Sequence, residues 1–245
     1  MSARVTGATA LRVLTQLRRD PRTIALLLLV PPFLITLLKY AFEGNPGAFE
    51  AIAAPLVGLF PFTTMFVVTS ITMLRERTTG TLERLMAMPL AKLDLLLGYG
   101  IAFGVVGVLQ ALVTSFVAFG LLGLDVAGST GLVIVIAVLD ALLGMSLGLF
   151  VSAFARTEFQ AVQFMPAFVF PQLLLCGLFV ARDQMAPALE AVSYALPLTY
   201  AFDALDRVAN EGSLGTAGAL DVVVICAVTV LSLALGAATL RRRTP

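Results

Sequence analysis

Apolar residues come in six long runs along the 245-residue chain, and polar segments separate the runs. A helix needs about 20 apolar residues to cross a bilayer, and each run is of that order. The first run follows a long charged preface and has no small-residue cleavage site after it, so we interpret it as a retained span and not as a signal peptide. The pattern predicts six membrane-spanning helices, over residues 23–42, 50–73, 94–122, 131–153, 160–181 and 217–240.

The segment 3–20, before the first run, has a helical pattern of its own. Val13, Leu14 and Leu17 fall near one helical face, and arginines occupy the polar part. A short amphipathic helix of this kind lies in the plane of the membrane interface. The sequence therefore predicts an interfacial helix that ends at Asp20-Pro21, because proline cannot continue it.

The segment 182–212, between the fifth and sixth runs, is amphipathic on both sides of Pro197. Its apolar residues recur at helical spacing, which predicts two short helices hinged at the proline and half-sunk in the outer leaflet or the protein. These residues are Met185, Leu189, Val192 and Leu196, and then Leu198, Phe202, Leu205 and Val208.

The composition is that of an integral membrane protein and not of a soluble one, so we predict an all-α membrane fold. The chain is 59% hydrophobic and 13% charged, whereas soluble domains are about 25% charged. Its net charge of +1 makes nucleic acid an unexpected partner. Histidine is absent, and Cys176 and Cys226 lie in apolar runs where we expect them to be buried. No metal site is predicted.

The basic residues orient the predicted spans. Of the 16 lysines and arginines, only Lys39, Arg182 and Arg207 fall on one side, and the other thirteen fall on the opposite side. Basic residues accumulate on the cytoplasmic side of membrane proteins. Both termini and the loop 74–93 are therefore predicted to be cytoplasmic.

The loop 74–93 contains a compact charged stretch that is typical of a short docking helix. Gly80 permits a turn into a helix, Glu83 falls in the first helical turn, and Pro89 ends the helix. The alternative to a docking helix is a plain loop whose positive charges serve only to keep it on the cytoplasmic side of the membrane. The residues that we expect to contact a soluble partner are Glu76, Arg77, Gly80, Thr81, Leu82, Glu83, Arg84 and Pro89.

Asp140 is the one acid deep within a predicted span, 131–153. A charged carboxylate at the bilayer centre costs about 2.5–3.5 kcal/mol on insertion scales. Two interpretations remain open: a proton-relay or substrate contact, and a structural hydrogen bond to a neighbouring helix. Gln110, Gln163 and Gln172 are the candidate partners.

Prolines in the second and fifth predicted spans make these helices candidates for bending. Thr63, Thr64 and Gln163 lie nearby and could face a translocation path, although a threonine also bonds to its own helix backbone. Gly100-x-x-x-Gly104 and Gly144-x-x-x-Gly148 predict close helix packing. The prolines are Pro55, Pro61, Pro166 and Pro171.

The chain has no nucleotide-binding signature of its own. A P-loop needs a Gly-Lys pair followed by serine or threonine to hold phosphates, and neither Lys39 nor Lys92 follows a glycine. We therefore expect no ATPase activity from this chain alone.

Four motifs together resemble the membrane subunit of type-2 ABC transporters, the six-span exporters of bacteria. The loop 75–89 and the segment 196–205 carry the resemblance most specifically, and 19–22 and 95–98 add to it. The motifs are Arg19-Asp20-Pro21-Arg22, Arg75-Glu76-Arg77-x-x-Gly80-Thr81-Leu82-Glu83 through Pro89, Leu95-Leu96-Leu97-Gly98, and Leu196-Pro197-Leu198-Thr199-Tyr200 with Asp203-Ala204-Leu205.

The resemblance implies a half-transporter in the bacterial cell membrane. A second permease chain, identical or paralogous, would face it across the path. Two copies of a separate ATPase subunit would bind ATP and Mg, and this chain would bind no cofactor. In such families 3–20 is a connecting helix, 74–93 is a coupling loop, and 182–212 forms the outer gate with Leu196, Pro197 and Tyr200.

The leading hypothesis is thus the permease of an ATP-driven exporter of hydrophobic or amphiphilic compounds, such as a drug, an antibiotic or a lipid-like molecule. The spans offer few fixed charges for a polar solute, and the export direction comes from the resemblance alone. A proton-coupled secondary transporter that uses Asp140 is the alternative, and a membrane scaffold that transports nothing is a third hypothesis.

Overall fold

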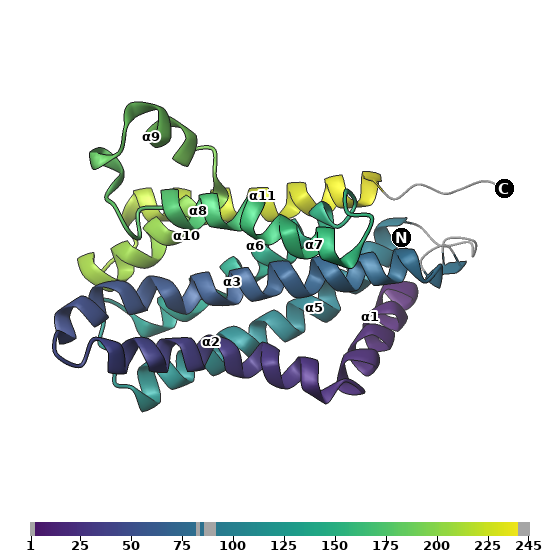
Figure 1. The fold of residues 1–245 in the computed structure, drawn as a ribbon, viewed down its shortest axis with the longest axis horizontal. Helices are drawn as coiled ribbons and strands as arrows, with labels where there is room; N and C mark the ends of the chain where they lie inside the picture. The colour runs from purple at the N-terminus through teal and green to yellow at the C-terminus, as the bar shows by residue number, and fades with distance from the viewer. Residues whose placement is uncertain (1–2, 82–83, 86–91, 240–245) are drawn as a thin grey trace.

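The computed structural model describes residues 3–81, 84–85 and 92–239, which form an elongated bundle of helices (Figure 1). Within these ranges every regular element is helical, which confirms the all-α membrane fold. Five of the described helices are long and apolar enough to cross a membrane. They are α2 (Pro21–Ala41), α3 (Pro46–Thr78), α5 (Lys92–Ser115) with its π-helical continuation η1 (Phe116–Leu121), α6 (Thr130–Val151) and α11 (Gly215–Thr239).

The predicted span 160–181 is different, because three short elements occupy it. α7 (Glu158–Phe164) leads into a π-helical turn, η2 (Met165–Val169), and then into α8 (Phe170–Leu175). Pro166 and Pro171 each lack a backbone N–H, so the regular hydrogen-bond ladder cannot pass through both. The chain leaves the helix after Leu175 and reaches Gly177 at φ +113°. The count of six spans therefore stays a prediction.

Proline has the opposite outcome in α3, which was also expected to bend. This helix runs unbroken from Pro46 to Thr78 through Pro55 and Pro61. Both prolines are buried, so packing against neighbouring helices holds α3 continuous although two N–H donors are missing.

Short helices cover the two ends of the bundle. α1 (Ala3–Arg18) lies across one end, and α9 (Pro187–Ser193) and α10 (Pro197–Asp206) lie at the other (Figure 1). The 3₁₀ turn η3 (Arg182–Gln184) and the π turn η4 (Arg207–Glu211) flank them. The two helices predicted in 182–212 are therefore present, and Pro197 begins the second.

The interior is built around the contact of α3 with α6. A Cβ atom added to Gly144 would overlap the carbonyl oxygen of Phe62, and one added to Gly148 would overlap the carbonyl oxygen of Phe66. Thr69 bridges the same contact, because its hydroxyl donates to the Met145 carbonyl at 3.2 Å. The predicted Gly144/Gly148 packing motif is confirmed.

The glycine prediction for α5 is confirmed at Gly104 and not at Gly100. A Cβ added to Gly100 would meet only Leu233, at 3.9 Å, which is ordinary van der Waals contact, and one at Gly104 would meet a movable Leu142 side chain at 3.2 Å. The tight contact is at Gly98, where the Thr9 Cβ of α1 would be 2.5 Å away. The tightest of these contacts is therefore with α1, while Gly104 packs against α6.

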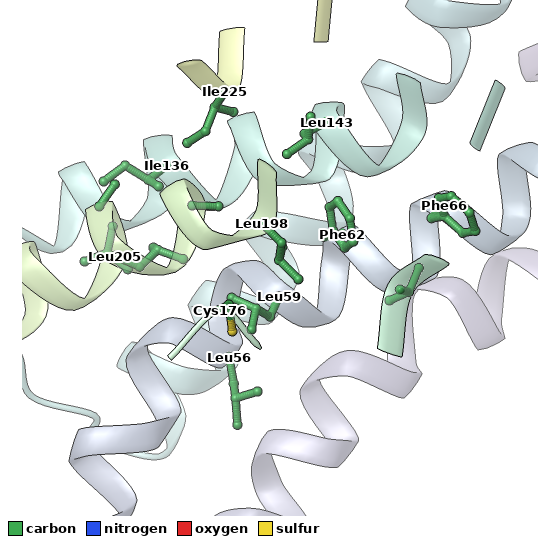
Figure 2. Close-up of a cluster of buried hydrophobic side chains, with 14 of the residues drawn as sticks. Leu56, Leu59, Phe62, Phe66, Ile136, Leu143, Cys176, Leu198, Leu205 and Ile225 are labelled. Carbon is green, nitrogen blue, oxygen red and sulfur yellow. The ribbon is translucent and has the colours of Figure 1, made fainter. Parts of the chain in front are cut away.

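A large apolar cluster joins α3, α6, α10 and α11 (Figure 2). Cys176 is buried within it as expected, but Cys226 is exposed on α11, so its predicted burial was wrong. Periodicity could not decide this, because α11 is apolar on every side. The labelled members in Figure 2 include Leu56, Leu59, Phe62, Ile136, Leu205 and Ile225.

Candidate functional site

Three side chains from three helices meet at the α1 end of the bundle. Arg12 of α1 forms an ion pair with Glu76 near the end of α3, with 3.4 Å between Nη1 and Oε1. The same guanidinium donates to the Tyr99 hydroxyl of α5, and its carbon lies 5.6 Å from the centre of that ring. We call Arg12, Glu76 and Tyr99 the Arg12 cluster. Glu76 is 7% exposed, so its charge needs a partner.

The local sequence explains why α1 reaches this position. Its apolar stripe, including Val13 and Leu17, is buried in the cluster that α5 and α6 form. The absent side chain at Gly98 lets α1 approach α5 at Thr9. The face that was predicted to contact the membrane surface thus packs largely on protein.

A second ion pair joins the end of α3 to the start of α7. Arg75 donates from Nε to Glu158 Oε1 at 2.8 Å and from Nη2 to Oε2 at 3.0 Å. These hydrogen bonds lower the pKa of the Glu158 carboxyl below its ordinary value. The pair is exposed, so it contributes little to stability, but its two parallel hydrogen bonds fix the position of α7 relative to the end of α3.

Asp20 sits between α1 and α2 and caps α2. Its carboxylate accepts from the Thr23 amide at 3.2 Å and from the Thr23 hydroxyl at 2.6 Å. These two hydrogen bonds lower the pKa of Asp20. The predicted break at Asp20-Pro21 is therefore a capped helix start, with proline in the first turn, where it costs no hydrogen bond.

A pocket of about 400 Å³ lies between α1, the start of α2 and the end of α3. We call it the α1–α3 pocket. Val13 and Leu17 are its buried apolar residues. Its other lining residues are polar or charged: Gln16, Asp20, Thr23, Thr72, Arg75, Glu76, Thr79 and Thr81.

The other end of the bundle is held by a separate polar network of Arg182, Asp203, Tyr194 and Tyr200, which we call the outer network because it lies in the segment of the predicted outer gate. Arg182 forms an ion pair with Asp203 of α10 at 2.7 Å, and its guanidinium carbon lies 5.4 Å from the centre of the Tyr194 ring. The Tyr200 hydroxyl donates to the Tyr194 carbonyl at 2.7 Å. Burial raises the pKa of Asp203, and Arg182 opposes the rise. α9 and α10 are thus tied to each other.

The residues of the predicted outer gate lie within this tied segment. Leu196 is the residue that precedes α10, Pro197 is its first residue, and both are half-buried, as is Tyr200. The next amide, Leu198 N, donates to Gln172 Oε1 of α8 at 3.3 Å. Their role as a gate stays a prediction.

Asp140 is fully buried in α6. Its Oδ2 would lie 3.3 Å from a Cβ at Gly58 of α3, and Leu205 of α10 approaches the same glycine. Neither carboxylate oxygen has a hydrogen-bond partner among the described residues. Asp140 therefore lies in the interior at the point where α3, α6 and α10 meet.

The three glutamines expected near Asp140 point elsewhere. Gln110 donates to the Leu27 carbonyl at 2.9 Å, and Gln172 donates to the Phe168 carbonyl at 3.0 Å. Gln163 is exposed on α7. No hydrogen bond joins any of the three to Asp140.

The structure does not bring the predicted path residues into one site. The hydroxyls of Thr63 and Thr64 both donate to the Phe60 carbonyl at 2.9 Å, which is the self-satisfied alternative. Both threonines are half-buried on α3, while Asp140 is buried and Gln163 exposed. A path along these residues stays a prediction.

Comparison with known proteins identifies the family. A sequence model described as ABC-2 type transporter matches residues 5–208, from α1 through α10 and into η4. The chain belongs to the ABC-2 type transporter family. The match includes both polar networks and the whole of the apolar cluster except its α11 side.

Several curated proteins are similar to this ABC-2 chain. The probable multidrug ABC transporter permease YbhS of Escherichia coli is 28% identical over 178 residues, which are 72% of this chain and 47% of the relative. ABC transporter G family member 20 of Dictyostelium discoideum is 27% identical over 171 residues, 69% of this chain and 23% of the relative. Linearmycin resistance permease protein LnrN of Bacillus subtilis is 26% identical over 157 residues, 64% and 40% respectively. The chain spans about half the length, or less, of these relatives.

The predicted coupling loop is only partly described in this ABC-2 chain. Glu76 and Arg77 belong to the last turn of α3, and Arg84 is exposed. Gly80 has φ +71°, a turn conformation that suits glycine. Leu82, Glu83 and Pro89 lie outside the described residues.

α3 ends at Thr78 and Gly80 has a left-handed backbone, so the helix that contains Glu76 and Arg77 does not continue into the loop. Sequence reasoning also missed Arg12, Tyr99 and Glu158. The available signals were Tyr99 near the start of an apolar span and Arg12 beside the apolar stripe of α1. Neither signal indicates which residue is the partner.

Proposed function

We propose that this chain is the membrane permease subunit of an ATP-driven exporter, energised by a separate ATPase subunit. The observation that carries the proposal is the family match over residues 5–208. It covers the helices that hold the Arg12 cluster and the outer network, and it ends before α11.

The Arg12 cluster supports a way for force to enter the bundle. The turn at Gly80 follows directly on the last turn of α3, which contains Glu76. A partner that moves the loop 74–93 would therefore move the end of α3. Because Glu76 is paired with Arg12, and Arg12 with Tyr99, the motion would pass to α1 and α5. The pair Arg75–Glu158 would pass it to α7.

The opposite end is suited to respond. α10 is buried against the bundle along Leu198, Ala201 and Leu205, and it is held to α8 and to Arg182 by few polar contacts. A transport cycle needs two packed states with different partner affinity. We propose that α9 and α10 form the outer gate, with Leu196, Pro197 and Tyr200 at its hinge.

The proposed substrate is hydrophobic or amphiphilic: a drug, an antibiotic or a lipid-like compound. The relatives named as multidrug and linearmycin resistance permeases support a drug-related role. Within the described interior the charged side chains are few, and a polar solute would need more of them.

The proposed assembly contains two permease chains, identical or paralogous, and two ATPase subunits that bind ATP and Mg. It lies in the bacterial cell membrane with both termini in the cytoplasm. Outward-facing apolar residues on α2 and α11 are available to lipid or to the second permease chain.

The test is reconstitution of the chain with its co-expressed ATPase subunit in liposomes. We expect ATP-dependent transport of an amphiphilic dye, and ATPase stimulation that falls when Glu83 and Arg84 are both replaced by alanine. Replacement of Glu43 in the turn after α2 and of Glu50 at the start of α3 by alanine, at the opposite end of the bundle, serves as the control. Unchanged coupling in the loop variant would argue against the proposal.

The buried, unpartnered carboxyl of Asp140 favours one alternative, proton-coupled secondary transport. The alternative predicts transport that survives ATP depletion and collapses with the proton gradient. It also predicts that Asp140→Asn abolishes transport, whereas the ATP-driven proposal predicts that this variant keeps ATP-dependent transport. A scaffold that transports nothing would show neither activity.

A further inference from the structure

We propose that the α1–α3 pocket accepts a basic side chain, lysine or arginine, of the soluble ATPase subunit. The inference rests on the proposed function, because it names how the partner is held at that same end of the bundle. It concerns a pocket formed by α1, the start of α2 and the end of α3, and four of its lining residues, Arg75, Glu76, Thr79 and Thr81, belong to the predicted coupling loop 74–93.

The first observation is an unused carboxylate oxygen. Glu76 lines the pocket, is 7% exposed, and uses only Oε1 for Arg12. Its Oε2 has no hydrogen-bond partner among the described residues. A buried carboxylate oxygen without a donor is costly, and a cationic donor restores the most free energy.

The second observation is the balance of charge around the pocket. Arg75, the basic lining residue, already gives two hydrogen bonds to Glu158. Arg12 is engaged by Glu76 and Tyr99. Asp20 adds another carboxylate to the lining. Arg22, two residues after Asp20, adds a third guanidinium that acts on Asp20, so the three carboxylates are balanced overall and Glu76 Oε2 is the atom that still lacks a donor.

The shape of the pocket suits a long side chain. Its volume is about 400 Å³, and Val13 and Leu17 supply apolar surface for a methylene stem. The hydroxyls of Thr23, Thr72, Thr79 and Thr81 lie around the lining as further acceptors. A lysine or arginine would thus bury its stem and bring its charge to Glu76 and Asp20.

An amine-bearing lipid headgroup has similar chemistry and is the competing occupant. The protein partner is favoured because Thr79 and Thr81 place the pocket next to Gly80, in the segment that leads into the predicted coupling loop. The experiment has to separate the two occupants.

The test uses the full chain, purified in nanodiscs of phosphatidylglycerol, and the ATPase subunit that copurifies with the tagged chain from its native membrane. Affinity is measured between 50 and about 300 mM NaCl, because charge pairing weakens with salt. Glu76→Gln keeps the size of the side chain, and Asp20→Asn keeps a helix-capping oxygen. We expect each to weaken ATPase binding, Glu76→Gln by about 10–100-fold, and both to flatten the salt dependence.

Two controls separate charge in the pocket from displacement of α1. Glu43→Gln removes an exposed carboxylate from the turn between α2 and α3, at the far end of the bundle, and leaves affinity unchanged. Arg12→Gln breaks the Arg12 cluster but keeps both pocket carboxylates, so we expect it to weaken ATPase binding less than Glu76→Gln does. An equal loss in Arg12→Gln and Glu76→Gln, with none in Asp20→Asn, would overturn the pocket proposal.

The remaining outcomes are also decisive. If no ATPase copurifies with the wild-type chain, the proposed function fails. If ATPase binds and the pocket variants do not change its affinity, only the pocket proposal fails. If the variants act only when phosphatidylethanolamine is added to the nanodiscs, the occupant is a lipid and the proposal is wrong. If the variants do weaken binding, a reciprocal charge swap completes the test. Asp20→Lys in this chain should weaken binding, and changing the contacting basic residue of the ATPase to glutamate should restore it.

Discussion

Arg12 in the N-terminal helix and Glu76 in the last turns of α3 form an ion pair across 64 positions of sequence, with 3.4 Å between Nη1 and Oε1. Glu76 is nearly buried, whereas the Arg12 side chain is 30% exposed. The pair therefore compensates a charge that folding has taken from water. It also makes the position of α1 depend on the position of the end of α3.

Replacing Arg12 by glutamine should destabilise the protein by about 1–3 kcal/mol, because the Glu76 carboxylate loses its charged donor. Thermal unfolding in detergent, followed by fluorescence-detected gel filtration, measures the effect. Arg4→Gln changes an exposed arginine of the same helix and should stay within about 0.5 kcal/mol. In a double-mutant cycle, Arg12→Gln and Glu76→Gln should not add, and strict additivity would show that the pair has no stabilising contact.

Replacing Gly148 by alanine should destabilise the bundle by about 1–3 kcal/mol, because the new methyl group would overlap the α3 backbone at Phe66. Gly100→Ala is the matched control, since its nearest neighbour is 3.9 Å away. Detergent thermal stability of the two variants should differ clearly. Similar melting temperatures would mean that α6 does not approach α3 as closely as described.

The Arg75–Glu158 pair should contribute only where Glu158 is ionised. Its folded pKa is lowered from the ordinary 4.5 by hydrogen bonds from Arg75. For a lowered acid pKa, the contribution is complete above the unfolded pKa and disappears as pH falls through the folded pKa. Wild type and Glu158→Gln should thus differ by a constant amount from pH 7 to 5 and converge below about 4.5.

Proteolytic nicking in the region 154–160 across this pH range is a suitable measurement, because it reports on the start of α7 alone. Glu190→Gln, in α9 at the other end of the bundle, is the control. A difference between wild type and Glu158→Gln that grows on acidification would contradict the assignment.

Replacing Arg182 by glutamine should loosen the outer helices and cost about 3 kcal/mol at neutral pH, because Asp203 would keep a buried charge without its partner. Burial already raises the pKa of Asp203 in the wild type, and loss of Arg182 removes the group that opposes the rise. A raised acid pKa favours the fold at low pH and loses that benefit as pH increases. The defect should therefore shrink as pH falls toward 3.8.

Hydrogen exchange over 182–212 measures this effect directly. Arg156→Gln changes an exposed arginine outside the outer network and should leave exchange in the outer helices unchanged. Loosening that is independent of pH would show that Arg182 acts by packing on Tyr194 and not through Asp203.

The sequence predicted several of the features that depend on local pattern. The long apolar runs predicted α2, α3, α5, α6 and α11, and Pro197 predicted the start of α10. The Gly144/Gly148 spacing predicted the contact with α3. Local rules sufficed because each of these features needs only a length, a period or a missing side chain.

Prediction failed where two distant elements had to be placed against each other. Gly100 and Gly98 are both glycines of α5, but only the position of α1 shows that Gly98 is the one under contact. Three glutamines were candidate partners of Asp140, but Gln110 and Gln172 bond to the backbone carbonyls of Leu27 and Phe168, and Gln163 faces outward. The sequence offers many possible partners for each hydrogen-bonding side chain, and only the packing of the helices decides which of them is within reach.

By itself, the sequence determined that this protein lies in a membrane, which segments are helical, which end carries the positive charge, and which family it resembles. Those properties follow from the free energy of moving apolar and charged groups between water and lipid, and that free energy depends on residue type and spacing. Tertiary structure alone decided that Arg12 meets Glu76 and Tyr99, that Arg75 meets Glu158, and that Glu76 and Asp20 line one pocket. Those meetings depend on how whole helices pack, and packing is set by the shapes of all the apolar faces together.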